Sequence, residues 1–205
     1  MTRASISNLA LLNVTGSDGA EIFHGCSQDW YGGPWKRGAG CGPSTFSNVL
    51  WYTRRREDAR LLSKADFLVL MNDVWKSVTP GFHGIPSTQK LVSGITAYTH
   101  KNALDIKTRE FQVPEDKAAR STFAELVDFL AGSLAGDMPV AFLSLDKGEE
   151  ENLDTWHWVT LISVEYNDEK TAAFIEVLDN CKHLRADLAL WFKTTGRGGG
   201  FVGFY

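Results

Sequence analysis

The chain has 205 residues, of which 43% are hydrophobic and 22% are charged, and its formal net charge is -4. This length fits one domain, and the composition excludes the disordered and fibrous classes of protein. The slight acidic excess argues against a general nucleic-acid-binding protein, which would carry a surplus of Lys and Arg. We therefore expect a single globular domain over residues 1–205 with no nucleic-acid partner.

The cysteines and the hydropathy pattern indicate the compartment. Cys26, Cys41 and Cys181 are too few, and odd in number, to form a disulfide framework. No apolar stretch approaches the 18 uninterrupted residues that indicate a membrane helix, and no secretory signal pattern is present. We expect a soluble, cytoplasmic protein with reduced thiols and no membrane partner. Without a Cys-x-x-Cys pair, we also expect no structural zinc. The sequence does not indicate the oligomeric state.

The first 40 residues are rich in glycine and aromatic side chains and have weak periodicity. Such a stretch is typical of a loop with aromatic anchors. A helical stripe follows at positions i, i+3, i+4 and i+7, formed by Phe46, Val49, Leu50 and Thr53. Pro43 suits the first turn of this helix, because its missing N–H would have no partner there. The pattern therefore predicts a helix whose start lies next to Cys41.

Two further helices are predicted in the first half. Ser63 followed by Asp66 is an N-terminal capping signal. The core-facing side chains of that helix are predicted to be Leu68, Met71, Trp75 and Val78. Another helix is expected over residues 87–101, and a strand over residues 104–113.

Strands dominate the second half. Thr122 and Glu125 form a capping box for a helix. Strands are predicted over residues 140–145, 156–166 and 172–178, followed by a short helix over 187–194 and a closing strand over 201–205. Because helices and strands do not alternate, the predicted class is α+β. We expect a loop-rich and helical part over about residues 1–103 and a mainly antiparallel sheet over about residues 104–205.

Cys41 is the most informative residue. It lies between a glycine-rich loop and the predicted start of a helix, where the helix dipole and unpaired N–H groups stabilise a thiolate. Gly40 and Gly42 flank the sulfur with minimal bulk, so that a substrate carbonyl can approach the backbone. From position alone, a small buried hydrophobic side chain at a helix start remains an equal alternative.

His157 and the Asp179-Asn180 pair complete a possible nucleophilic site. A thiolate catalyst needs a base, and His157 opens a buried strand next to a flexible acidic loop. The following strand ends at Asp179, 22 residues later, and an antiparallel hairpin would bring that end beside the ring. Either Asp179 or Asn180 would then orient the imidazole. Taken singly, an edge histidine and a polar turn are the commoner interpretations.

These stretches resemble papain-like cysteine peptidases. The matching segments are Gln28-Asp29-Trp30-Tyr31-Gly32-Gly33, Gly40-Cys41-Gly42-Pro43-Ser44, His157-Trp158-Val159 and Asp179-Asn180. They are most similar to the branch related to bacteriocin-leader-processing (double-glycine) peptidases, over roughly residues 26–192. The resemblance implies a papain-like fold in which a helical N-terminal subdomain packs on a C-terminal antiparallel sheet.

The resemblance also implies the site residues. Cys41 would be the nucleophile, His157 the general acid and base, Asp179 the orienting residue, and Gln28 an oxyanion donor together with the Cys41 N–H. Trp30, Gly40 and Trp156 are expected near the substrate. The implied activity is hydrolysis of a peptide or protein substrate without a cofactor or metal. An acyltransferase with the same residues and a catalytically silent peptide-binding module remain alternatives.

Overall fold

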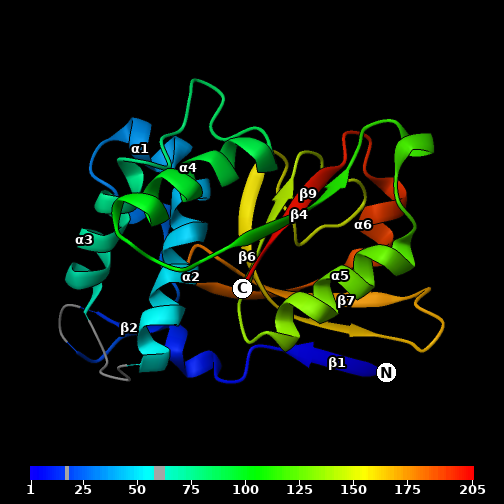
Figure 1. Ribbon diagram of the computed structural model, residues 1–205, viewed down its shortest axis with the longest axis horizontal. Coiled ribbons are helices and arrows are strands. Elements are labelled where there is room, and N and C mark those ends of the chain that lie inside the picture. Colours follow the sequence, from blue (N-terminus) through cyan, green and yellow to red (C-terminus); the bar gives the residue numbers. More distant parts are fainter. Residues whose placement is uncertain (17–18, 58–62) are drawn as a thin grey trace.

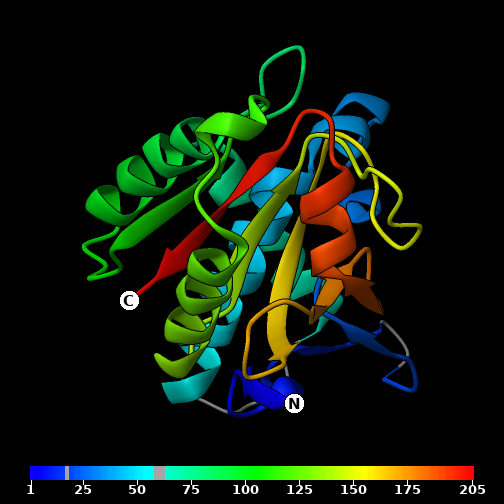
Figure 2. The ribbon, with the colours of Figure 1, turned by 90° about the vertical axis from the view of Figure 1, so that its right-hand side faces the viewer.

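The computed structural model describes residues 1–16, 19–57 and 63–205. Within these ranges an antiparallel sheet of seven strands forms the centre of the protein (Figures 1 and 2). Its strands are β1 (Thr2–Ser5), β4 (Thr108–Val113), β5 (Val140–Ser144), β6 (His157–Tyr166), β7 (Ala173–Asp179), β8 (Lys182–Asp187) and β9 (Gly199–Phe204). Their spatial order is β4-β9-β5-β6-β7-β8, and β1 pairs with β6. The predicted α+β order is therefore confirmed.

Strand β6 is the longest strand, and three others pair with it. On one edge, β5 pairs with the first half of β6 and β1 pairs with the second half. On the other edge, β7 forms a hairpin with β6. Seven of its ten residues are buried in a continuous run, as expected for a strand covered on both faces. This central strand is a rigid support for the residue at its start, His157.

The helices of the first half lie on one side of the sheet. Figure 1 shows α1 (Pro34–Ala39), α2 (Cys41–Glu57), α3 (Lys64–Trp75) and α4 (Thr88–Lys101) there, with α5 (Phe123–Ala135) and α6 (Leu188–Thr194) towards the other side. One continuous hydrophobic core joins helices and sheet. Both predicted capping boxes are confirmed, at the starts of α3 and α5. In the described ranges, no helix is long and apolar enough to cross a bilayer.

The prediction of a loop over the first 40 residues is wrong. Strand β1 joins the central sheet, β2 (Asn13–Thr15) pairs with β3 (Ile22–His24), and short 3-10 helices, η1 (Leu9–Leu12) and η2 (Gln28–Trp30), precede α1. These strands have three or four residues, too few for an alternating pattern to show. Strand β1 exists because distant β6 offers it hydrogen-bond partners, which local sequence does not reveal.

Two other elements differ from the predictions. The buried face of α3 consists of Phe67, Leu70, Met71 and Val74. The predicted core-facing residues, apart from Met71, therefore lie mostly one position too far along the chain. Strand β8 was not predicted, because its turn is Asn180-Cys181 and lacks the Asn-Gly pattern typical of tight hairpins. Both turn residues have positive φ, 45° and 68°, the values such a two-residue turn requires. A third short 3-10 helix, η3, spans Lys117–Ala119.

Candidate active site

Cys41 is the first residue of the 17-residue helix α2. The side chain is 9% exposed and lines both a groove of about 430 Å³ and a small inner cavity. Its position at the helix N-terminus places the sulfur near the positive end of the helix dipole. The sulfur is therefore largely screened from solvent but open to a bound ligand.

The glycines beside Cys41 serve packing. A Cβ at Gly40 would lie 2.6 Å from the Lys36 carbonyl oxygen and 2.8 Å from the Tyr31 ring. A Cβ at Gly42 would lie 2.8 Å from Ile85 Cδ1. All three distances are shorter than real Cβ contacts allow. The small residues thus let helix α1 and the loop before α4 pack closely around the thiol.

His157 and Asp179 meet at the end of the β6–β7 hairpin. The His157 Nε2 atom lies 2.7 Å from Asp179 Oδ1, and the two side chains are 12% and 16% exposed. His157 begins β6 and Asp179 ends β7. The register that pairs Thr160 with Leu178 brings these two ends together. The contact follows from antiparallel pairing, as the sequence predicted.

The surroundings of His157 favour its charged form. Burial by itself lowers the pKa of the imidazole, because a buried cation loses its hydration. Hydrogen bonds and electrostatic attraction to Asp179 and Cys41 act in the opposite direction and are stronger together. The net effect raises the pKa of His157 to about 10. The ring is therefore a cation at neutral pH, next to the thiol and the carboxylate.

Asn180 has a different partner from Asp179. Its Oδ1 atom accepts hydrogen bonds from Ser27 Oγ at 3.0 Å and from the Gln28 backbone N–H at 3.1 Å. The ring of His157 is thus bonded by Asp179, while Asn180 ties the segment before η2 to the β7–β8 turn. Gln28 lines the small inner cavity together with Cys41 and His157, and its Oε1 atom is buried without a hydrogen-bond partner.

Asn48 is a residue that the sequence analysis missed. Its side chain is buried, accepts a hydrogen bond from the Cys26 N–H at 2.9 Å and donates one to Thr160 Oγ1 at 2.9 Å. One amide thus joins α2, the segment that leads to Gln28, and strand β6. The sequence held only a weak signal, because Asn48 lies two helical turns after Cys41 on a face that also carries Ser44 and Thr45.

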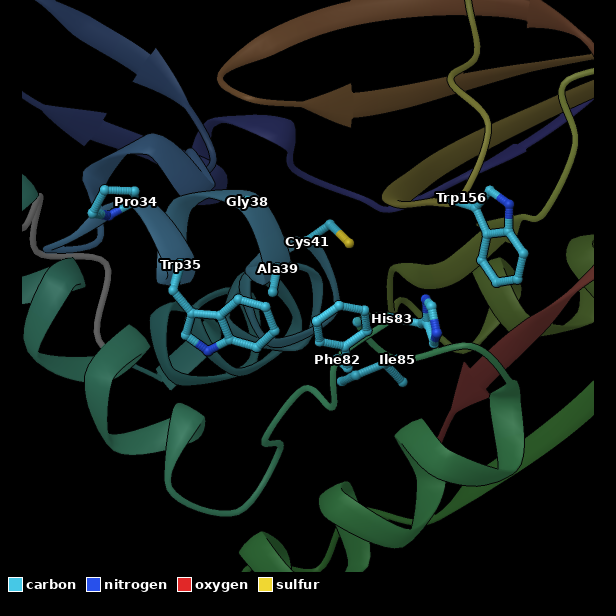
Figure 3. A pocket seen from close by; sticks show the side chains of 10 residues that line it. Pro34, Trp35, Gly38, Ala39, Cys41, Phe82, His83, Ile85 and Trp156 are labelled. Carbon is cyan, nitrogen blue, oxygen red and sulfur yellow. The ribbon is translucent and has the colours of Figure 1, made fainter.

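The groove beside Cys41 is lined by aromatic side chains (Figure 3). Trp35 from α1, Phe82 from the α3–α4 loop and Trp156 before β6 are 52%, 87% and 46% exposed. They account for three of the seven large hydrophobic side chains that are exposed in the described chain. The α3–α4 loop is held to β6 by the Trp158 indole, which donates to the Ile85 carbonyl at 2.7 Å. The aromatic groove is therefore anchored to the same strand as His157.

The three expected substrate-binding residues lie in different places. Trp156 lines the groove, with a left-handed φ of 59°. Gly40 does not line the groove and packs against the Tyr31 ring. Trp30 is turned towards the core, where its ring lies 5.3 Å from Phe23 and 6.1 Å from Phe67. Trp35, whose place near the proposed site residues made it a possible groove wall, does line the groove. Phe82 could not be foreseen there, because aromatic content alone does not distinguish walls from core.

Within the described residues, one cluster has the composition of a metal site. Ligand atoms of Asp154, His157 and Asp179 lie within 4.8 Å of one another. Asp154 is exposed and lies in the loop before β6. The cluster therefore shares two residues with the arrangement around Cys41.

Comparison with known proteins agrees with this architecture. No family model matches the chain, and neither does any curated protein. The crystal structure of UfSP from C. elegans matches with a TM-score of 0.57 and 12% identity, and the match covers 99% of this chain. The chain has a papain-like α+β fold. It spans 34% of the UfSP chain, and nothing in the comparisons supports the bacteriocin-leader branch.

Proposed function

We propose that this protein is a cysteine-type peptidase that hydrolyses an amide bond of a peptide or protein through Cys41. The observation that carries the proposal is the position of the thiol, at the N-terminus of α2 and next to an imidazole that bonds Asp179 at 2.7 Å. The papain-like fold and a groove that opens beside the sulfur add support.

The reaction begins with the Cys41 thiolate and the protonated His157 ring. The sulfur attacks the amide carbonyl and forms a tetrahedral intermediate whose oxygen carries the negative charge. The Gln28 side-chain amide and the Cys41 backbone N–H donate hydrogen bonds to this oxygen, an interaction typically worth several kcal/mol. His157 gives its proton to the nitrogen as the C–N bond breaks, and the amine leaves. Sulfur then holds the acyl group as a thioester.

Water completes the cycle. His157, now neutral, accepts a proton from a water molecule that attacks the thioester carbonyl. The second tetrahedral intermediate collapses, the C–S bond breaks, and the carboxylic acid leaves. The thiolate and the imidazolium are restored. Asp179 holds the ring in one orientation throughout and stabilises its positive charge.

The other cysteines provide an internal control for testing this proposal. Burial raises the pKa of the Cys26 thiol, and it raises the pKa of Cys181 to about 12. Neither thiol is therefore expected to react quickly with an alkylating reagent at neutral pH. Cys41, by contrast, faces the groove and a cationic ring.

The test is iodoacetamide labelling against pH, with each cysteine resolved by mass spectrometry, followed by a peptide-library screen. We expect Cys41 to label fast below about pH 8, and His157→Ala to slow that labelling. Cys41→Ala should abolish turnover, whereas Cys181→Ser should retain it. Labelling of Cys41 at the rate of a model thiol, without turnover, would contradict the proposal and favour a silent binding module. Transfer of the acyl group to an added amine in preference to water would identify an acyltransferase.

A further inference from the structure

We propose that Asp154, His157 and Asp179 bind a divalent ion of the zinc class, and that the bound ion inhibits the site at Cys41. The binding is a property of these three side chains alone. The inhibition rests on the proposed function, because it requires His157 to act as the acid and base. The ion is a reversible inhibitor in this proposal, with no part in the chemical step.

The chain brings the three ligands together from two adjacent strand ends. His157 starts β6, Asp179 ends the paired strand β7, and Asp154 lies three residues before His157. Between them, Trp156 has a left-handed φ of 59°, which bends the chain just ahead of β6. The hairpin therefore fixes two ligands, and the loop brings the third back over them.

The distances are close to those of a metal site. With bonds of about 2.1 Å, the ligand atoms of a tetrahedral zinc ion lie about 3.4 Å apart. The three ligand atoms here lie within 4.8 Å of one another, and the His157–Asp179 pair is 2.7 Å apart. The pair must open by less than an ångström, and Asp154 must move inward by a little over an ångström at most. Asp154 is exposed and has the freedom to do so.

The donor set selects the kind of ion. One imidazole nitrogen with two carboxylates suits zinc and similar transition metals, whereas magnesium and calcium prefer oxygen donors throughout. Asp154 has no hydrogen-bond or ion-pair partner in the described part of the chain, so its carboxylate is available. Asp179 and His157 are largely buried, which shields the ion on one side. Three protein ligands leave a fourth position for water.

Binding of the ion replaces the proton between His157 and Asp179, so that the ring loses its positive charge. The ion takes the Nε2 lone pair, and the proton shared with Asp179 leaves to solvent. The ring is then held as a neutral metal ligand and cannot become the imidazolium that protonates a leaving amine. The Cys41 thiolate also loses its cationic partner. A chelator that takes the ion away lets Nε2 regain its proton.

The experiment uses zinc and the full-length chain with Cys41→Ala, so that the thiol cannot be a ligand. Calorimetric titration should give one zinc ion per chain, and Asp154→Asn in this background should weaken it by about tenfold or more. Asp168→Asn is the matched control, because it removes the same charge from an exposed turn. Calcium should not bind at this position. At the same zinc concentration, the NMR resonances of the His157 ring nitrogens should shift in the Asp168→Asn control and should not shift in Asp154→Asn.

Each outcome decides a separate point. Equal zinc affinity in Asp154→Asn and Asp168→Asn would overturn the site, and so would equal binding of calcium and zinc. Activity is measured in the protein with Cys41 intact, and each variant is compared with its own rate without metal. Zinc should lower the activity of the Asp168→Asn control at concentrations that leave the activity of Asp154→Asn unchanged. Zinc binding in the protein without any peptidase activity would leave the site standing and would count against the proposed function alone.

Discussion

The helical side and the sheet side of the site are held in place by different means. On the sheet side, two paired strands place His157 and Asp179, so that a ladder of backbone hydrogen bonds fixes their geometry. On the helical side, the start of α2 places Cys41; this helix packs into the common core, and single side chains make its polar connections near the site. Asn48 joins α2 to β6, and Asn180 joins the Gln28 segment to the β7–β8 turn.

The difference predicts where substitutions do harm. A strand contact is supported by its neighbours, so that a change on the sheet side should alter chemistry more than structure. A buried amide that makes two bonds has no substitute. A change on the helical side should therefore alter structure and chemistry together.

The largest effect is expected from Asp179→Leu, which keeps roughly the volume of the side chain and removes both its charge and its hydrogen bond to His157. Loss of the carboxylate lowers the pKa of His157, because its largest stabilising partner is gone. We expect activity to fall by on the order of 10²–10⁴, with a loss in the free energy of unfolding no larger than the lowered pKa of His157 accounts for. NMR titration of the ring measures the pKa and chemical denaturation measures stability. A large loss of stability would show that the sheet side is not self-supporting.

Asn48→Leu tests the helical side. The substitution leaves the buried Cys26 N–H and the Thr160 hydroxyl without their partner, which should cost about 2–4 kcal/mol in the free energy of unfolding. Thr160→Val is the control, since it removes one of the two bonds and should cost less. Chemical denaturation of both variants gives the comparison. Equal losses would mean that the bond to Cys26 contributes nothing.

Asn180 separates hydrogen bonding from backbone strain. Asn180→Gly keeps the positive φ of 45° accessible but removes the bonds to Ser27 and Gln28. It should cost about 1–2 kcal/mol and, if Gln28 acts as proposed, lower kcat, because the segment that carries Gln28 loses this connection. Asn180→Ala should cost about 1 kcal/mol more, because alanine is strained there. If the alanine variant were as stable as the glycine variant, the turn geometry would not matter.

The remaining prediction is a pH dependence of stability carried by His157. The pKa of this group is raised from about 6.5 in the unfolded chain to about 10 in the folded protein. Its contribution is therefore present in full below about pH 6.5 and is lost as the pH rises through about 10. The difference in unfolding free energy between the wild type and His157→Gln should shrink over this range. A difference that grows with pH would contradict the assignment of the charged ring.

The features that the sequence predicted correctly are those whose interacting residues lie close together along the chain or at the ends of one hairpin. Thr122 with Glu125, and Ser63 with Asp66, are local signals, and both predicted the helix starts that the structure has. The His157–Asp179 contact was predictable because the two residues lie at the ends of one hairpin.

Interactions between distant segments could not be read in the same way. Asn48 bonds to Cys26, 22 positions before it, and to Thr160, 112 positions after it. No local sequence pattern predicts either partner. The exposure of Phe82 results from the loop that displays it, since a phenylalanine is more often part of a core. Strand β1 likewise depends on a partner more than 150 residues away.

Strand β9 has a consequence for the order in which the protein is completed. It lies between β4 and β5 in the sheet, and yet it follows both in the chain, after all the other described strands. Strands β4 and β5 therefore cannot be joined during synthesis until β9 has left the ribosome. Until then the edges of β4 and β5 that pair with β9 have no partner strand. Helix α4 packs on both β4 and β9, so it also lacks part of its support. Assembly of the site's surroundings thus waits for β9 to enter the middle of the sheet.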